Sequence, residues 1–297
     1  MGEEKKLDLD RRATLKSATG RWCNRLLRLL WRGAAVYLLV MVLLMFLEEK
    51  LIFFPSRYPS GDWNPQGLRF EDVEFRARDG VRLHGWYCPV ESPRAVVLVS
   101  HGNAGNLSDR APEIILWQRH LHVSVFIYDY RGYGRSEGSP QEQGLYDDVR
   151  GAYRWLTETQ LVPGNDIVLR GESIGSAVSL ELALEVPCRA LIMESPFTSA
   201  VDVGQRTFPW LPVRRIMRNR FDNAAKIGRY HGPLLITHGD CDSIIPYDMG
   251  QELFELANEP KRFYAVHGAD HNDVPYTGGG DYFRALSDFL DWVSRKP

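Results

Sequence analysis

Cysteine is scarce in this chain, and the overall charge is nearly balanced. Only four cysteines occur among 297 residues, and their spacing fits neither a zinc site nor a disulfide framework. The formal net charge of −2 gives no electrostatic basis for binding nucleic acid. Internal repeats and low-complexity tracts are also missing. These absences argue against a domain held by metal or disulfides and against a nucleic-acid-binding protein.

The charge is nevertheless uneven, because residues 1–33 contain nine Lys/Arg and four Asp/Glu. The uncharged stretch Ala34–Leu47 follows at once. Counted back to Leu26, the apolar stretch has 22 residues, interrupted only by Arg28 and Arg32. About 20 apolar residues span a bilayer. No small-residue cleavage site follows, so the pattern favours a retained signal-anchor over a cleaved signal peptide or a buried helix.

This interpretation divides the chain into four parts. They are a basic N-terminal segment (1–33), a transmembrane signal-anchor (34–50), a Pro- and Gly-rich linker (51–68) and one domain (69–297). The positive-inside tendency places the N-terminus in the cytoplasm. We therefore expect a single-pass membrane protein whose domain lies on the periplasmic or extracytoplasmic side.

Within the domain, short apolar runs bounded by turn residues alternate with longer helix-like segments. A hairpin is predicted around Asp79-Gly80, and six buried strands separated by helices follow. Such alternation is typical of a parallel sheet with helices on both faces. The predicted fold class is therefore α/β, with a mostly parallel eight-stranded sheet in a single domain.

The pattern G-x-S-x-G, which carries the nucleophilic serine of many hydrolases, occurs twice. "GRSEG" places Ser136 in a long Gly-rich loop that gives the serine no fixed direction. "GESIG" instead joins a predicted strand directly to a predicted helix, as a nucleophile turn requires. The N-terminus of that helix would also favour an anionic intermediate beside Ser173. Ser173 is therefore the candidate nucleophile.

A nucleophilic serine needs a histidine base and an acid that orients it. The loop after the strand "PLLITH" offers Asp240 and Asp242, and the loop after "RFYAV" offers His267 and His271. Both loops leave the carboxyl ends of strands, at the edge of the sheet where Ser173 is expected. Glu194 is a further candidate acid. His101 and His238, which lie at strand ends beside glycines, are expected to be structural.

From "DVEFRARDG" to its C-terminus the chain resembles α/β-hydrolase-fold serine hydrolases, and with its anchor it is similar to their membrane-anchored ABHD-type subgroup. The resemblance implies that Ser173 is the nucleophile, Asp242 the acid and His271 the base. It also implies an oxyanion hole made by the backbone N–H groups of Asn103 and Ile174, and a reaction without metal or cofactor. The motifs that carry it are "SHGNAGN", "YDYRGYGRSEGSP", "GESIGS", "HGDCDSIIP" and "GADHND".

The expected activity is hydrolysis of acyl esters or thioesters through an acyl-enzyme. An acyltransferase or a peptidase with the same triad, and a non-catalytic membrane-anchored binding scaffold, are the alternatives. The insertion from Glu194 to Pro233 is too short for a large lid, so we expect a small lid of one or two helices. It combines apolar residues with the arginines Arg214, Arg215, Arg218 and Arg220. They form either a solvated surface or one that faces anionic lipid headgroups and feeds acyl substrates to Ser173.

Overall fold

The computed structural model describes residues 2–295, and their side chains except those of residues 3–21, 23 and 24. The chain divides into two units, Met1–Glu48 and Glu49–Pro297. The side chains of the basic segment 1–33 therefore lie largely outside the described residues.

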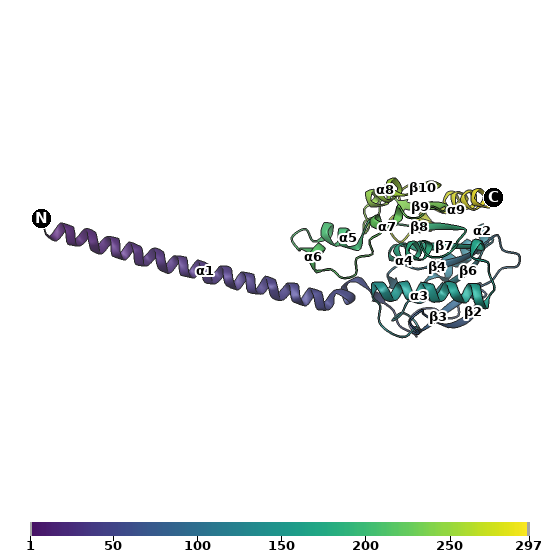
Figure 1. Ribbon diagram of the computed structural model, residues 1–297, viewed down its shortest axis with the longest axis horizontal. Helices are drawn as coiled ribbons and strands as arrows, with labels where there is room; N and C mark the ends of the chain where they lie inside the picture. The colour runs from purple at the N-terminus through teal and green to yellow at the C-terminus, as the bar shows by residue number, and fades with distance from the viewer. Residues whose placement is uncertain (1, 296–297) are drawn as a thin grey trace. The chain divides into compact units, whose positions relative to one another are not determined.

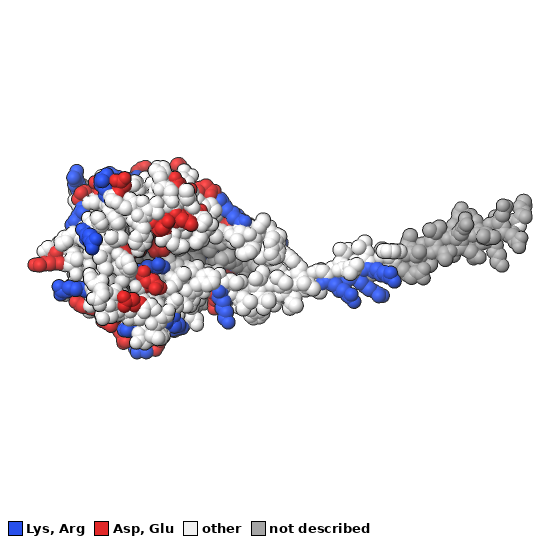
Figure 2. All heavy atoms as spheres, turned by 180° about the vertical axis from the view of Figure 1, so that it is seen from behind, with Lys and Arg blue, Asp and Glu red and all other residues white. Residues whose placement is uncertain are grey.

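One long helix, α1 (Glu3–Ile52), makes up the first unit and ends four residues inside the second. Its stretch Arg25–Ile52, 28 residues, is long and apolar enough to cross a membrane. Figure 2 shows this stretch as a largely white surface with a few basic side chains near its start. The apolar helix that we predicted at 34–50 is present and extends beyond both of those bounds.

An eight-stranded sheet forms the centre of the second unit, as predicted. β2 and β3 make the hairpin around Asp79-Gly80, β3 pairs antiparallel with β6, and all other neighbours are parallel. The parallel strands come from continuous apolar runs, and every residue of β4, β6 and β8 is buried. Across the sheet the order is β10 (Lys261–Val266), β9 (Leu234–Gly239), β8 (Ala190–Glu194), β7 (Ile167–Glu172), β4 (Val96–Ser100), β6 (Ser124–Tyr128), β3 (Arg82–Cys88) and β2 (Glu71–Arg76).

Helices cover both faces of the sheet, and each face has its own core. In β4, Val96 and Leu98 point into one core, whereas Val97 and Val99 point into the other. The first core lies under α3 (Glu142–Arg154), α4 (Ile174–Ala183) and α8 (Tyr247–Leu256), and the second under α2 (Ala111–Leu121) and α9 (Val274–Ser294). Figure 1 shows α3 lying across the near side of the sheet. Short helical turns occur at η1 (Leu107–Arg110), η2 (Trp155–Thr159) and η3 (Gly164–Asp166).

The lid between β8 and β9 is small, as predicted, but it contains three short helices rather than one or two. They are α5 (Ala200–Thr207), α6 (Val213–Ile216) and α7 (Ala224–Ile227). Two of these are single turns of four residues, too short to give a readable helical period in the sequence.

The segment expected to be a linker is packed onto the domain, because the compact unit begins at Glu49. Phe53 is only 3 % exposed. The two-residue strand β1 (Phe54–Pro55) pairs in parallel with β5 (Ala104–Gly105). Apolar burial and backbone pairing thus fix residues that composition alone marks as a flexible connection.

Candidate active site

Ser173 lies at a sharp turn between the last residue of β7 and the first residue of α4, as predicted. Its backbone angles, φ 53° and ψ −118°, are unusual for a residue other than glycine. A Cβ added at Gly171 would lie 2.1 Å from the carbonyl oxygen of Gly175. One added at Gly175 would lie 2.0 Å from that of Ser100. The two glycines therefore allow the close approach of strand and helix that forces Ser173 into this turn.

Ser136, in the second G-x-S-x-G pattern, has a structural role. It is 1 % exposed. Its hydroxyl donates to the carbonyl of Asp129 at 2.7 Å and accepts from the backbone N–H of His84 at 3.0 Å. These bonds hold the Gly-rich loop against β3, and they leave the hydroxyl no freedom to attack a substrate.

Asp242 and His271 meet at the carboxyl edge of the sheet, in the loops that follow β9 and β10. His271 Nδ1 lies 2.7 Å from Asp242 Oδ2. The other carboxylate oxygen accepts the backbone N–H groups of Ile244 and Ile245 at 2.9 and 2.7 Å. The carboxylate is fully buried, and the imidazole is 6 % exposed. An oriented imidazole backed by a buried carboxylate is the arrangement that a general base requires.

The Asp242 carboxylate also contacts a second histidine. His238 Nε2 lies 3.2 Å from Asp242 Oδ2 and 3.1 Å from the carbonyl oxygen of Ile245. Burial works to raise the pKa of Asp242, but the hydrogen bonds from His238, His271 and the Ile245 N–H outweigh it and lower that pKa. Asp242 is therefore held in its ionised form.

The alternative pair, Asp240 and His267, also forms a contact, at 2.8 Å. The His267 side chain is 88 % exposed, however. A base for an acyl-enzyme mechanism must lie beside the nucleophile, where water is largely excluded. Exposure therefore separates this pair from the buried pair of Asp242 and His271.

His271 lies close to the turn that carries Ser173. A cavity of about 40 Å³ is lined by His271 together with Glu172, the residue before Ser173, and Glu194. The Ser173 backbone N–H in turn donates to the Glu194 carbonyl at 2.9 Å. No hydrogen bond between described residues joins Ser173 Oγ to His271. In many hydrolases this contact tightens only in the substrate complex.

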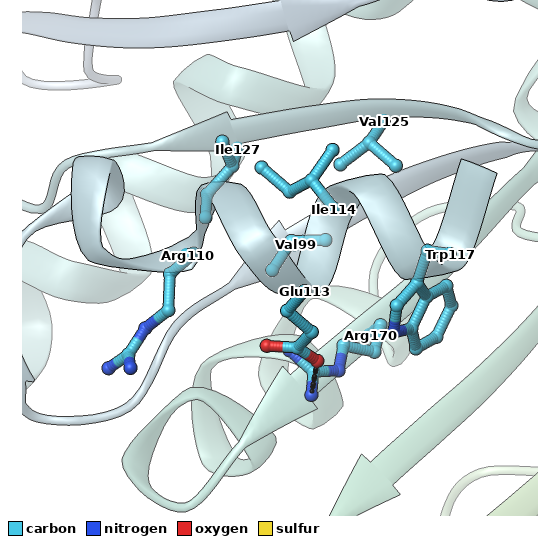
Figure 3. Close-up of a pocket in the computed structure, with 8 residues that line it drawn as sticks. All are labelled: Val99, Arg110, Glu113, Ile114, Trp117, Val125, Ile127 and Arg170. Atoms are coloured by element: carbon cyan, nitrogen blue, oxygen red, sulfur yellow. Dashed lines mark ion pairs between the residues drawn. The ribbon is translucent and has the colours of Figure 1, made fainter. Parts of the chain in front are cut away.

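Glu194, the other candidate acid, is engaged elsewhere. It pairs with Arg170 at 2.7 Å and accepts the hydroxyl of Tyr282. Figure 3 shows Arg170 beneath Glu113, with which it forms an ion pair at 2.5 Å. Burial raises the pKa of Glu113 to about 7, although Arg170 opposes the shift. These groups form a buried ionic cluster next to the site, and the contacts of Glu194 belong to it.

Asn103 and Ile174, the expected oxyanion donors, lie in the loop after β4 and at the first position of α4. Neither backbone N–H donates a hydrogen bond to any described residue. The Asn103 carbonyl accepts the hydroxyl of Tyr133 at 2.6 Å, and its side-chain Nδ2 donates to the Ile52 carbonyl at 2.6 Å. His101, at the end of β4, is fully buried, and burial lowers its pKa to about 4. It is therefore a neutral packing residue, as expected.

Known proteins match most of this chain. A family model described as "Serine aminopeptidase, S33" matches residues 91–224. The uncharacterized protein Rv2307c of Mycobacterium tuberculosis is 39 % identical over 262 residues, covering 86 % of this chain and 93 % of its own. The protein bem46 of Schizosaccharomyces pombe is 33 % identical over 277 residues, covering 88 % and 92 %. The esterase Pf2001 of Pyrococcus furiosus shares the fold, with a TM-score of 0.67 at 21 % identity over 80 % of this chain and 98 % of its own. The chain belongs to the α/β-hydrolase family.

Two features of this α/β hydrolase site were missed in the sequence. One is the contact of His238 with Asp242. The spacing H-G-x-x-D, which puts His238 at the end of a strand and Asp242 in the loop four residues later, was the available signal. The other is the pair of hydrogen bonds that Tyr133 and Ile52 form with Asn103, which no local sequence pattern indicates. Among the side chains that the structure describes, no group of three or more His, Cys, Asp or Glu is arranged to hold a metal ion.

Proposed function

We propose that this α/β hydrolase is a membrane-anchored serine hydrolase that cleaves acyl esters or thioesters through an acyl-enzyme. The observation that carries the proposal is the buried Asp242–His271 contact at the sheet edge where Ser173 occupies a strained turn. A serine without a catalytic role would require neither a buried Asp–His pair nearby nor a strained backbone.

In the proposed mechanism, His271 Nε2 takes the proton from Ser173 Oγ as that oxygen attacks the acyl carbonyl carbon. The Asp242 carboxylate fixes the imidazole tautomer through Nδ1 and stabilises the imidazolium. The backbone N–H groups of Asn103 and Ile174 bind the oxygen that becomes negative. His271 returns its proton to the leaving alcohol or thiol, and water, activated in the same way, releases the acid.

An ester or thioester is the favoured substrate class, for two reasons. The solved structure of Pf2001, whose fold is similar, is named an esterase, and the lid between β8 and β9 consists of short helices only. A peptidase is the second candidate, favoured by the description of the matching family model. An acyltransferase would use the same triad with an alcohol in place of water. Product analysis with and without glycerol separates transfer from hydrolysis, and aminoacyl amides offered beside matched esters test the peptidase.

The anchor is the stretch Arg25–Ile52, most of whose apolar side chains are exposed. Leu38, Leu39 and Phe46 are 62, 67 and 82 % exposed. A bilayer would cover them. With the N-terminus in the cytoplasm, the hydrolase unit lies on the extracytoplasmic side. Protease added outside intact spheroplasts should then digest the hydrolase unit, and protection of that unit would reverse the proposed orientation.

Labelling by a fluorophosphonate probe tests the nucleophile. We expect the full-length protein to be labelled and Ser173→Ala to be inert. Ser136→Ala is the matched control, because it changes the serine of the other G-x-S-x-G pattern and should keep its labelling. Persistent labelling of Ser173→Ala would refute the assignment. Absence of labelling and of ester hydrolysis in the wild type would favour a binding scaffold.

A further inference from the structure

The chain that leaves α1 lies against a loop of the proposed active site. We call Ile52–Tyr58 the exit segment and Asn103–Asn106 the oxyanion loop. Phe54 and Pro55 pair in parallel with Ala104 and Gly105. The Ser56 N–H donates to the Gly105 carbonyl at 2.9 Å, and the Phe54 N–H donates to the Asn103 carbonyl at 3.3 Å. The oxyanion loop therefore has the exit segment as its strand partner.

Asn103 is held mainly by this segment. Its Nδ2 donates to the Ile52 carbonyl at 2.6 Å, and its carbonyl accepts from the Phe54 N–H and the Tyr133 hydroxyl. Two of these three bonds come from the exit segment. They fix the side chain and the carbonyl of the residue whose N–H is the proposed oxyanion donor.

The exit segment is itself tied to a second loop. The Gly134 N–H donates to the Ser56 carbonyl at 2.9 Å, and the Tyr58 N–H donates to the Gly134 carbonyl at 3.0 Å. The Arg57 guanidinium donates to the carbonyls of Ser136 and Gly138 at 2.9 and 3.0 Å. Backbone and side-chain bonds thus anchor the three residues after β1 to the Gly-rich loop.

The segment also reaches the lid. Phe53, 3 % exposed, packs edge-to-face on Phe221, with ring centroids 6.3 Å apart. Phe221 is fully buried and lies in the lid insertion, between α6 and α7. One stretch of seven residues therefore contacts the oxyanion loop and the Gly-rich loop, and Phe53 links it to the lid.

We infer that the exit segment is a positioning element of the active site, which holds Asn103 so that its N–H faces the developing oxyanion. The inference rests on the proposed function. It makes the stretch that joins anchor to hydrolase a working part of the enzyme rather than a tether. The Asn103 side chain and Phe53 act through the loop geometry and do not touch the reacting atoms.

The test measures transition-state binding in the full-length protein. Asn103→Ala removes the bond to Ile52 but keeps the backbone N–H, and Phe53→Ala removes the packing on Phe221. We expect each to lower kcat for a p-nitrophenyl ester by about 10- to 100-fold, with KM changed less than about twofold. Inhibition by a trifluoromethyl ketone, whose adduct with the serine carries an oxyanion, should weaken by a similar factor.

Asn258→Ala is the matched control for Asn103→Ala. Asn258, in the loop between α8 and β10, donates from Nδ2 to the carbonyl of Gly228, the residue after α7, also at 2.6 Å. Its loss should leave kcat and inhibition unchanged. Phe53→Leu, which keeps an apolar side chain, should restore kcat to within about threefold of the wild type.

Three results separate the outcomes. Wild-type kinetics and inhibition in Asn103→Ala and Phe53→Ala, with Ser173 still labelled, would overturn the inference alone. Equal losses of kcat in Phe53→Leu and Phe53→Ala that parallel a fall in melting temperature would also overturn it, because a purely structural role of Phe53 predicts that result. If Ser173→Ala is still labelled, the proposed function itself is refuted, and the inference that rests on it is refuted as well.

Discussion

Substitution of Gly175 by alanine tests whether close backbone packing creates the turn at Ser173. The added Cβ would lie 2.0 Å from the carbonyl oxygen of Ser100, against an ordinary contact of at least 3.4 Å. The backbones of α4 and β4 must therefore separate by about 1.4 Å, because a main-chain carbonyl in a sheet cannot rotate away. Overpacking of this kind costs up to about 3 kcal/mol. A displacement of about 1 Å at a reacting group costs on the order of 10²-fold in rate.

We therefore expect Gly175→Ala to lower the melting temperature by about 6–12 °C. Fluorophosphonate labelling of Ser173 should slow by about 100-fold. Gly280→Ala is the control, because its Cβ would meet no atom within 4 Å and it lies in α9. Differential scanning calorimetry and timed labelling measure the two effects. A Gly175→Ala variant that melts and labels like the wild type would refute the packing argument.

Four further predictions concern charge. Asp242→Asn should lower kcat about 10⁴-fold, whereas Asp240→Asn should change it less than about twofold. Since the lowered pKa keeps Asp242 ionised at every pH above its ordinary value of 3.8, log kcat/KM should fall with slope one on the acid side, and a slope of two would contradict this. Arg170→Met leaves its buried carboxylate partners unpaired and should cost about 3–5 kcal/mol of unfolding free energy in urea. Arg284→Met, at an exposed pair, should cost less than about 1 kcal/mol, and equal losses would count against the ionic cluster. Replacing four exposed arginines of the lid with alanine should slow hydrolysis of esters embedded in anionic vesicles but not of soluble esters. If the ratio of these two rates is the same in the wild type and in the variant, the headgroup hypothesis is wrong. The four are Arg214, Arg215, Arg218 and Arg220.

The sheet and the turn at Ser173 were predictable because their signals are local. Continuous apolar runs mark the buried parallel strands, and the spacing of Gly171 and Gly175 marks a strand that turns directly into a helix. The last element, α9, begins at Val274, but its backbone is not helical at Gly279, where φ is 49° and ψ is −135°. A run of three glycines is a local signal for a break, and here it divides the element into two helical stretches that meet at a kink.

The exit segment was not predictable from composition. Its one proline, and the prolines and glycines that follow it, are typical of a connection between domains, and a two-residue strand gives no period. What fixes it are partners about 50 to 80 residues away in the chain, such as Asn103 and Gly134. Contacts of this range depend on the finished fold, which brings the loops after β4 and β6 to one edge of the sheet.

The choice between two Asp–His pairs shows the same limit at the site itself. The sequence offered Asp240 with His267 and Asp242 with His271, in the same two loops. Burial alone would raise the pKa of Asp242 and favour its neutral form, which stabilises an imidazolium less than a carboxylate does. Three donors reverse that shift: His238, His271 and the backbone N–H of Ile245. The Ile245 N–H comes from the same loop as Asp242, and His238 comes from the end of β9, so a buried acid at this position requires the chain to fold around it. Any change that opens the loop between Asp242 and Ile245 should therefore raise the pKa of Asp242 and weaken the proposed base even where Asp242 and His271 remain.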